Sequence, residues 1–162
     1  MDSNSLTDST TSLKYFKELN VIITFCSMIL WIKFFITLLI LSKKSADTGN
    51  RTKEDLKTEI DKDKVEEEKK EAEIRWWYIE LNDLENIPFA LILFWGSRIV
   101  SVREGSRLAL CIIIPIYTFA RIVHTIVFAN AVFIPRFLVY LLSVCCLAAG
   151  GMVGVVDSFI AL

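Results

Sequence analysis

The sequence has few of the residues that build disulfide or metal centres. It contains one histidine and four cysteines, and no two cysteines have CxxC spacing. All four cysteines fall within apolar stretches, which argues against a disulfide framework and against a zinc site, so no metal is expected. The formal net charge is only −1, and nothing in it indicates a nucleic-acid partner. The first 18 residues are polar and the first apolar run is membrane-length, so we expect no cleavable signal peptide.

Apolar residues, in contrast, make up 54% of the chain, which is high for a small soluble protein. Residues 21–41 carry Lys33 as their only charge, and residues 137–156 carry none, so each run can cross a bilayer. A soluble four-helix bundle fits less well, because both runs are apolar on every face. The uncharged runs at 86–97 and 108–120 are shorter and reach membrane length only if charged residues are included.

We therefore predict an all-α integral membrane protein with one domain over residues 1–162. Its four-helix transmembrane bundle is expected to cross the bilayer at about residues 20–42, 75–101, 107–130 and 135–157. Residues 43–70 contain nine Lys or Arg, which places the connection over about 43–74 in the cytoplasm and both termini in the lumen. The second half of this connection is rich in helix-forming residues and is also compatible with a charged extension of the second span.

Two spans carry polar stripes. One face of the second span presents, at steps of three and four residues, Arg75, Tyr78, Asn82, Glu85 and Phe89. One face of the third span presents Tyr117, Arg121, His124 (or Thr125) and Phe128. The fourth span opens with Arg136 and has Tyr140 one turn later.

Ionisable groups at the centre of a membrane span cost ~2.5–3.5 kcal/mol each and usually face a partner or a wet cavity. For Lys33 and Asp83 we expect a structural ion pair that locks the bundle. The other polar side chains include at least three cations, one carboxylate and several neutral donors, a surplus that suits an anionic ligand with several functional groups. These candidates are Arg75, Asn82, Glu85, Arg121, His124, Arg136 and Tyr140.

The strings LNDLENI at 81–87 and ARIVHTI at 120–126 resemble the two signature regions of the membrane-associated proteins in eicosanoid and glutathione metabolism, the MAPEG family. The microsomal glutathione transferase branch is the most similar, and Lys33 matches a recurrent family lysine. The resemblance implies a homotrimer of the endoplasmic reticulum with glutathione bound between subunits. It assigns glutathione contacts to Arg75, Asn82, Glu85, Arg121, His124, Arg136 and Tyr140. It also implies that Arg136 favours the thiolate, which attacks a lipophilic electrophile or reduces a lipid hydroperoxide.

Several positions depart from the family pattern. Tyr78, Ile79 and Glu80 stand where many members have Arg-Ala-His. Phe128 replaces a common tyrosine, and Phe137 replaces the serine of prostaglandin E synthases, which counts against that activity. A lipid-presenting protein of the five-lipoxygenase-activating type, another eicosanoid synthase and a purely structural membrane protein remain alternatives.

Two further patterns each allow two interpretations. Trp76, Trp77 and Tyr78 are typical of an aromatic belt at the membrane interface, with a ligand-gripping role as the alternative. Cys146, Gly150 and Gly154 form a face of small residues suited to close helix packing, either within the chain or between chains.

Overall fold

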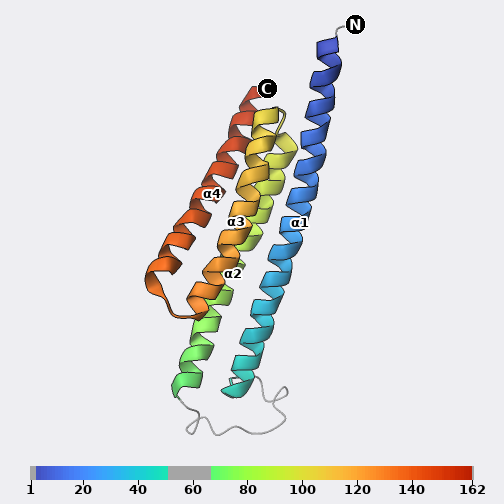
Figure 1. Ribbon diagram of the computed structural model, residues 1–162. Helices are drawn as coiled ribbons and strands as arrows, with labels where there is room; N and C mark the ends of the chain where they lie inside the picture. The colour runs from blue at the N-terminus through green and yellow to red at the C-terminus, as the bar shows by residue number, and fades with distance from the viewer. Residues whose placement is uncertain (1–2, 51–66, 162) are drawn as a thin grey trace.

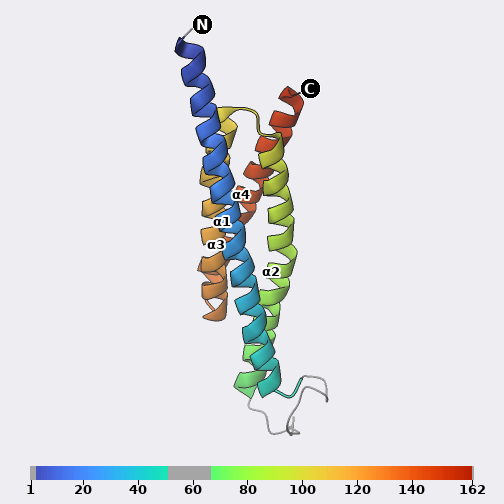
Figure 2. The same ribbon diagram turned by 90° about the vertical axis from the view of Figure 1, so that its right-hand side faces the viewer.

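The described residues of the protein, a computed structural model, form four long helices in an up-and-down bundle (Figure 1). The helices are α1 (Ser3–Asp47), α2 (Glu67–Val100), α3 (Glu104–Ala129) and α4 (Phe133–Ile160). The structure describes the backbone of residues 3–50 and 67–161, and the side chains from Lys14 onward within these ranges. Within the described ranges, α1 packs against α2 and α3, and α4 packs against α2 and α3, whereas α1 and α4 do not touch. Figure 2 shows the same arrangement with α1 beside α3.

Among the described residues, three helical segments are long and apolar enough to cross a membrane: Lys14–Asp47 of α1, α3 and α4. In the apolar windows of α1 and α4 only 22% of the residues are buried inside the bundle, so broad apolar faces point outward. Such faces are stable in lipid and not in water. The chain is therefore a multi-pass membrane protein, as its composition predicts.

The second helix falls short of the composition of a membrane span because polar and charged residues occupy its middle. The fold nevertheless requires α2 to cross the membrane. α1 and α3 run in the same direction, so α2, which connects them in the sequence, runs back in the opposite direction (Figure 1). Both termini and the connection at 101–103 consequently lie at one end of the bundle, which we call the termini end. The opposite end, where α1 ends and α2 begins, is called the loop end.

The helices extend further than the expected spans, most of all at the loop end. Residues 67–74, for which the sequence allows a charged connection or a charged extension of the second span, form the first two turns of α2. α1 continues to Asp47 and closes with Gly49 in the left-handed region, at φ 73°. The Asn50 amide donates to the Ser45 carbonyl and the Gly49 amide to the Ala46 carbonyl, the two hydrogen bonds of a Schellman motif.

A buried carboxylate from α2 fixes this turn. Glu73 accepts hydrogen bonds from Ser45 Oγ at 2.7 Å, Thr48 Oγ1 at 2.6 Å and Asn50 Nδ2 at 2.6 Å. The sequence shows only a run of charges here, without a recognisable motif. Glu73 thus joins the end of α1 to the start of α2, and this contact sets the relative height of the two helices.

The small face of α4 packs within the chain, against α2. A Cβ added to Gly150 would lie 2.5 Å from Phe94 Cε1, and one added to Gly154 would overlap Ser97. Ser97 Oγ also donates to the Gly150 carbonyl at 3.0 Å. These glycines therefore allow α2 and α4 to approach at backbone distance, which the packing of membrane helices favours.

Candidate functional site

The centre of the site is a carboxylate that lies between two cations from different helices. Asp83 of α2 is fully buried and forms ion pairs with Lys33 of α1 and Arg121 of α3. Lys33 Nζ donates to Asp83 Oδ2, and Arg121 Nη2 donates to Asp83 Oδ1 at 2.8 Å. Three helices are thus joined through one side chain at membrane depth. Asp83 lies one residue from Asn82 and off the polar stripe, and at this position of α2 its side chain faces the interior of the bundle.

Arg121 lies inside the bundle and not on an open surface. Its side chain is completely buried, and Nη2 also donates to Asn82 Oδ1 at 2.6 Å and to the Asn82 carbonyl at 3.3 Å. Nε and Nη1 have no hydrogen-bond partner among the described residues. Arg121 therefore fixes the orientation of the Asn82 amide through Nη2.

A second group of polar side chains gathers where α3 meets α4. The ring of buried His124 lies 6.1 Å from the ring of Tyr140 and 5.7 Å from that of Phe128. The Arg136 guanidinium lies over Phe128 at 4.3 Å and over Phe133 at 5.4 Å. These aromatic contacts hold a cation near a histidine and a tyrosine.

Phe128 stands where the resemblance leads one to expect a tyrosine, and it lacks that hydroxyl group, but its ring still contacts the site. Its ring positions both His124 and Arg136. The Nδ1 atom of His124 is buried and has no partner among the described residues, so it is available to a ligand or a water molecule.

Two of the sequence candidates lie apart from these groups in a single chain. Arg75 donates from Nη1 to the Ala129 carbonyl at 3.3 Å, and so caps the end of α3. Glu85 is exposed on the outer face of α2, and no hydrogen bond or ion pair of its side chain is found in the described part of the chain. One chain thus brings together Asn82, Arg121, His124, Arg136 and Tyr140, and leaves Glu85 facing outward.

Of the residues that depart from the family pattern, Tyr78 and Phe137 lie on the surface and Glu80 is buried. Tyr78 is 51% exposed and Phe137 is 56% exposed, whereas Glu80 is buried with one carboxylate oxygen unpartnered in the described ranges. Glu80 therefore replaces a family histidine at a position that faces the bundle, where it lies within electrostatic reach of Lys33.

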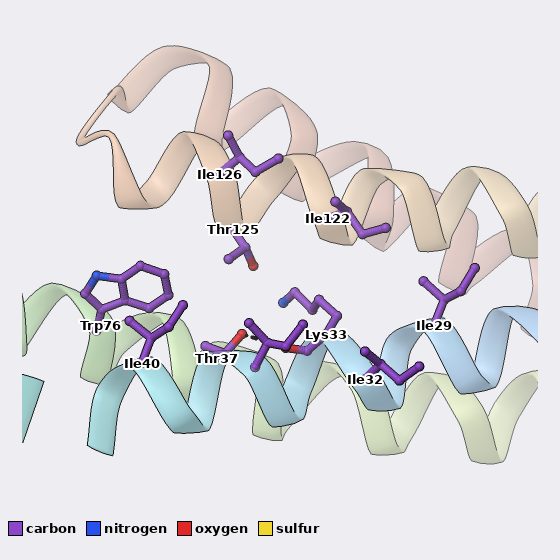
Figure 3. A pocket seen from close by; sticks show the side chains of 10 residues that line it. Ile29, Ile32, Lys33, Thr37, Ile40, Trp76, Ile122, Thr125 and Ile126 are labelled. Carbon is purple, nitrogen blue, oxygen red and sulfur yellow. Dashed lines mark hydrogen bonds between the residues drawn. The ribbon is translucent and has the colours of Figure 1, made fainter. Parts of the chain in front are cut away.

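The sequence reasoning missed a groove between α1 and α3 (Figure 3). Two adjoining cavities of about 320 and 310 Å³ share Ile29 and Ile122, and together they form what we call the α1–α3 groove. Seven of the 16 residues that line it are isoleucines, and few are polar, so no polar motif marks it in the sequence. Only the spacing of apolar residues on both helices, combined with their pairing, reveals it.

In a comparison with protein families, the model of the MAPEG family matches residues 22–156, most of the chain. No curated protein and no solved structure matches the sequence.

Proposed function

Because the chain belongs to the MAPEG family, we propose that it is a membrane glutathione transferase that joins the glutathione thiolate to lipophilic electrophiles or reduces lipid hydroperoxides. The family includes glutathione transferases and peroxidases, eicosanoid synthases and non-enzymatic activating proteins. The observation that favours a transferase is the group formed by His124, Arg136 and Tyr140, in which a cation and two polar rings meet near the loop end of α3 and α4.

The chemistry of these side chains suits glutathione, which carries two carboxylates, one ammonium, two amides and a thiol. The arginines are suited to the carboxylates, Glu85 to the ammonium, and Asn82 and His124 to the amides. In this proposal Arg121 acts through Asn82, whose side-chain oxygen it holds. The Asn82 NH₂ group then remains directed and available to the tripeptide.

Arg136 is the proposed catalytic residue. A free cysteine thiol has a pKa of about 8.5, so it is mostly protonated at neutral pH, and an adjacent guanidinium favours the thiolate. The thiolate sulfur attacks an electrophilic carbon and forms a C–S bond, and the leaving group departs with the electron pair. In the peroxidase version two glutathione thiols are oxidised to the disulfide while the hydroperoxide is reduced to an alcohol and water.

The outward position of Glu85 supports a site that is completed by a second subunit. An exposed carboxylate at membrane depth is costly unless a partner covers it. In a homotrimer, the assembly that the resemblance implies, Glu85 of one subunit would meet the Arg136 and Tyr140 group of its neighbour. Glutathione would bind between them at the cytoplasmic side, and the electrophile would enter from the bilayer.

A test is the ultraviolet absorbance of the glutathione thiolate, titrated into detergent-purified protein at neutral pH. We expect a saturable signal that Arg136→Ala abolishes. Arg98→Ala is the matched control, because Arg98 lies at the termini end, where its Nε donates to Asn20 Oδ1 at 2.5 Å. If folded protein binds no glutathione, the transferase proposal is wrong. Binding without a thiolate signal would refute the role of Arg136.

The lipid-presenting alternative has one observation in its favour. Phe128 and Phe137 stand where relatives carry a hydroxyl group, on a tyrosine and a serine respectively. The loss of both hydroxyl groups removes hydrogen-bond donors around a thiol and leaves an apolar surface. Loss of glutathione binding combined with retained lipid binding would support this alternative.

A further inference from the structure

We propose that Glu80 accepts the proton that the glutathione thiol loses, through water molecules bound in a polar layer inside the bundle. The inference rests on the proposed transferase function and names the place to which the thiol proton goes. The carboxylate of Glu80 becomes a carboxylic acid, while the sulfur keeps the electron pair of the S–H bond as a thiolate. Glu80 does not contact the sulfur, so it acts through the polar groups between them.

Buried polar atoms without partners gather at one level of the bundle. Six buried side-chain atoms have no hydrogen-bond partner among the described residues, and five of them belong to Glu80 of α2 and to residues 121–125 of α3. These five are Glu80 Oε2, Arg121 Nε and Nη1, His124 Nδ1 and Thr125 Oγ1. Their residues, together with Lys33 and Asp83, form what we call the polar layer. Buried polar groups normally have a partner, and bound water often supplies it, so these atoms are suited to hold water.

On one side, the polar layer joins Glu80 to α3. Glu80 lies within electrostatic reach of Lys33, whose Nζ donates to Asp83 Oδ2. Figure 3 shows the same amine turned toward the Thr125 hydroxyl across the space between α1 and α3. An ammonium has three donor hydrogens and Asp83 accepts one, so Lys33 can also hold water that bridges Thr125 and Glu80.

On the other side, the polar layer reaches the group proposed to hold the thiol. Arg121 and His124 lie three positions apart on α3, and both contribute buried nitrogens that lack a partner in the described ranges. The His124 ring lies 6.1 Å from the Tyr140 ring and within electrostatic reach of Arg136. Polar atoms therefore continue from Tyr140 to Glu80, and water between them would carry a proton without crossing an apolar region.

Charge favours Glu80 over bulk water as the acceptor. The polar layer holds two cations, Lys33 and Arg121, and two carboxylates, Asp83 and Glu80, so its formal charge is zero when all four are ionised. If the thiol proton left the bundle, the thiolate would add a negative charge at membrane depth, where ionised groups are costly. Transfer to Glu80 keeps the total charge unchanged. Arg136 attracts the thiolate but, as a cation, cannot take its proton.

Of the two carboxylates, Glu80 is the better acceptor. Both oxygens of Asp83 already accept from cations, Oδ1 from Arg121 and Oδ2 from Lys33. A proton on Asp83 would break one of these charge-assisted hydrogen bonds. Glu80 Oε2 is buried and has no partner in the described part of the chain, so it can take a proton without breaking a hydrogen bond.

The experiment is infrared difference spectroscopy on the protein in phosphatidylcholine nanodiscs, recorded when glutathione is added. A proton on Glu80 adds a carboxylic-acid C=O band to the spectrum. S-methylglutathione is the comparison ligand, because it has the same peptide and no thiol proton. Stopped-flow ultraviolet absorbance measures the rate of thiolate formation, and isothermal titration calorimetry measures the binding of S-methylglutathione.

Three variants separate proton transfer from structure. Glu80→Gln and Glu80→His both remove the negative charge, but only the histidine can accept a proton. Glu68→Gln is the matched control, because Glu68 is exposed on the same helix and lies outside the polar layer. Gel filtration and circular dichroism confirm that each variant is folded.

We expect the carboxylic-acid band with glutathione in the wild type and in Glu68→Gln, and no such band with S-methylglutathione. Glu80→Gln should lose the band and slow thiolate formation by about a hundredfold. Glu80→His should recover most of the rate and still lack the band. Binding of S-methylglutathione should be the same in the wild type and in all three variants.

Several outcomes would overturn the role of Glu80. A thiolate signal without the band in the wild type would overturn it and leave the transferase proposal standing. Equal rates in the wild type and Glu80→Gln would do the same, and so would a Glu80→His variant as slow as Glu80→Gln. Loss of S-methylglutathione binding in Glu80→Gln would show that Glu80 holds the peptide instead. Wild-type protein that forms no thiolate would overturn both proposals together.

Discussion

Asp83 should be the side chain on which the stability of the bundle depends most. It is fully buried and accepts hydrogen bonds from two cations, Lys33 and Arg121. Asp83→Ala leaves both cations buried without their counter-ion. Each charge-assisted hydrogen bond contributes about 1.5–3 kcal/mol, and breaking a buried pair typically costs about 3–5 kcal/mol. We expect a loss of about 3–5 kcal/mol in the free energy of unfolding.

The assay is an unfolding titration with sodium dodecyl sulfate in mixed micelles, followed by circular dichroism and tryptophan fluorescence. Asp83→Asn should be nearly as unstable as Asp83→Ala, because the amide preserves the shape and removes the charge. Glu68→Gln is the matched control on the same helix. Since Glu68 is exposed, lies outside the proposed site and has no partner in the described ranges, its substitution should change stability by less than about 0.5 kcal/mol.

A double-mutant cycle separates the ion pair from general packing. Once Lys33→Met has removed one cation, the loss of Asp83 should cost less, with a coupling of about 0.5–3 kcal/mol. Additive effects would refute the idea that Asp83 neutralises Lys33. The central role of Asp83 would be refuted if Asp83→Ala lowered stability no more than Glu68→Gln.

Gly154→Ala should lower the free energy of unfolding by about 1–3 kcal/mol, because the new methyl group overlaps Ser97. Gly96→Ala, the control, has nothing within 4 Å of the new methyl group and should be neutral or stabilising. Equal effects of the two substitutions in the same titration would contradict the packing argument. Glu73→Gln should speed amide hydrogen exchange over residues 45–50, since the carboxylate accepts three hydrogen bonds there, and unchanged exchange would refute its role. Asp157→Asn should speed exchange at residues 104–107, because Arg103 Nε and Ser106 Oγ donate to it at 2.7 and 2.9 Å; protection equal to the wild type would count against this contact.

The candidate site shows where sequence reasoning works and where it stops. The helical wheel identifies polar residues that share a face, and Asn82 and Arg121 do meet across two helices. The wheel cannot tell which of them faces a partner helix and which faces open space. Arg121 proved to be enclosed, while Glu85, on the same stripe as Asn82, points outward. That difference depends on how α2 and α3 are rotated against each other.

The start of α2 stays open in the sequence for a related reason. Residues 67–74 carry many charges, which is typical of a solvated connection, and also many helix-forming residues, which suit a charged extension of the second span. Glu73 accepts three hydrogen bonds from the end of α1, and these hold the charged extension in place as helix. The donors Ser45, Thr48 and Asn50 lie more than 20 residues away, so no local pattern links them to Glu73.

The sequence by itself determined that this chain is helical and enters a membrane, because apolar length and internally satisfied backbone hydrogen bonds are properties of each segment alone. It also determined which polar residues are present within the spans. Only the tertiary structure decided that Asp83 bridges Lys33 and Arg121, that the α4 glycines contact α2, and that isoleucines of α1 and α3 enclose a groove. These features arise from the register and rotation of packed helices, which many side chains fix together and no single segment encodes.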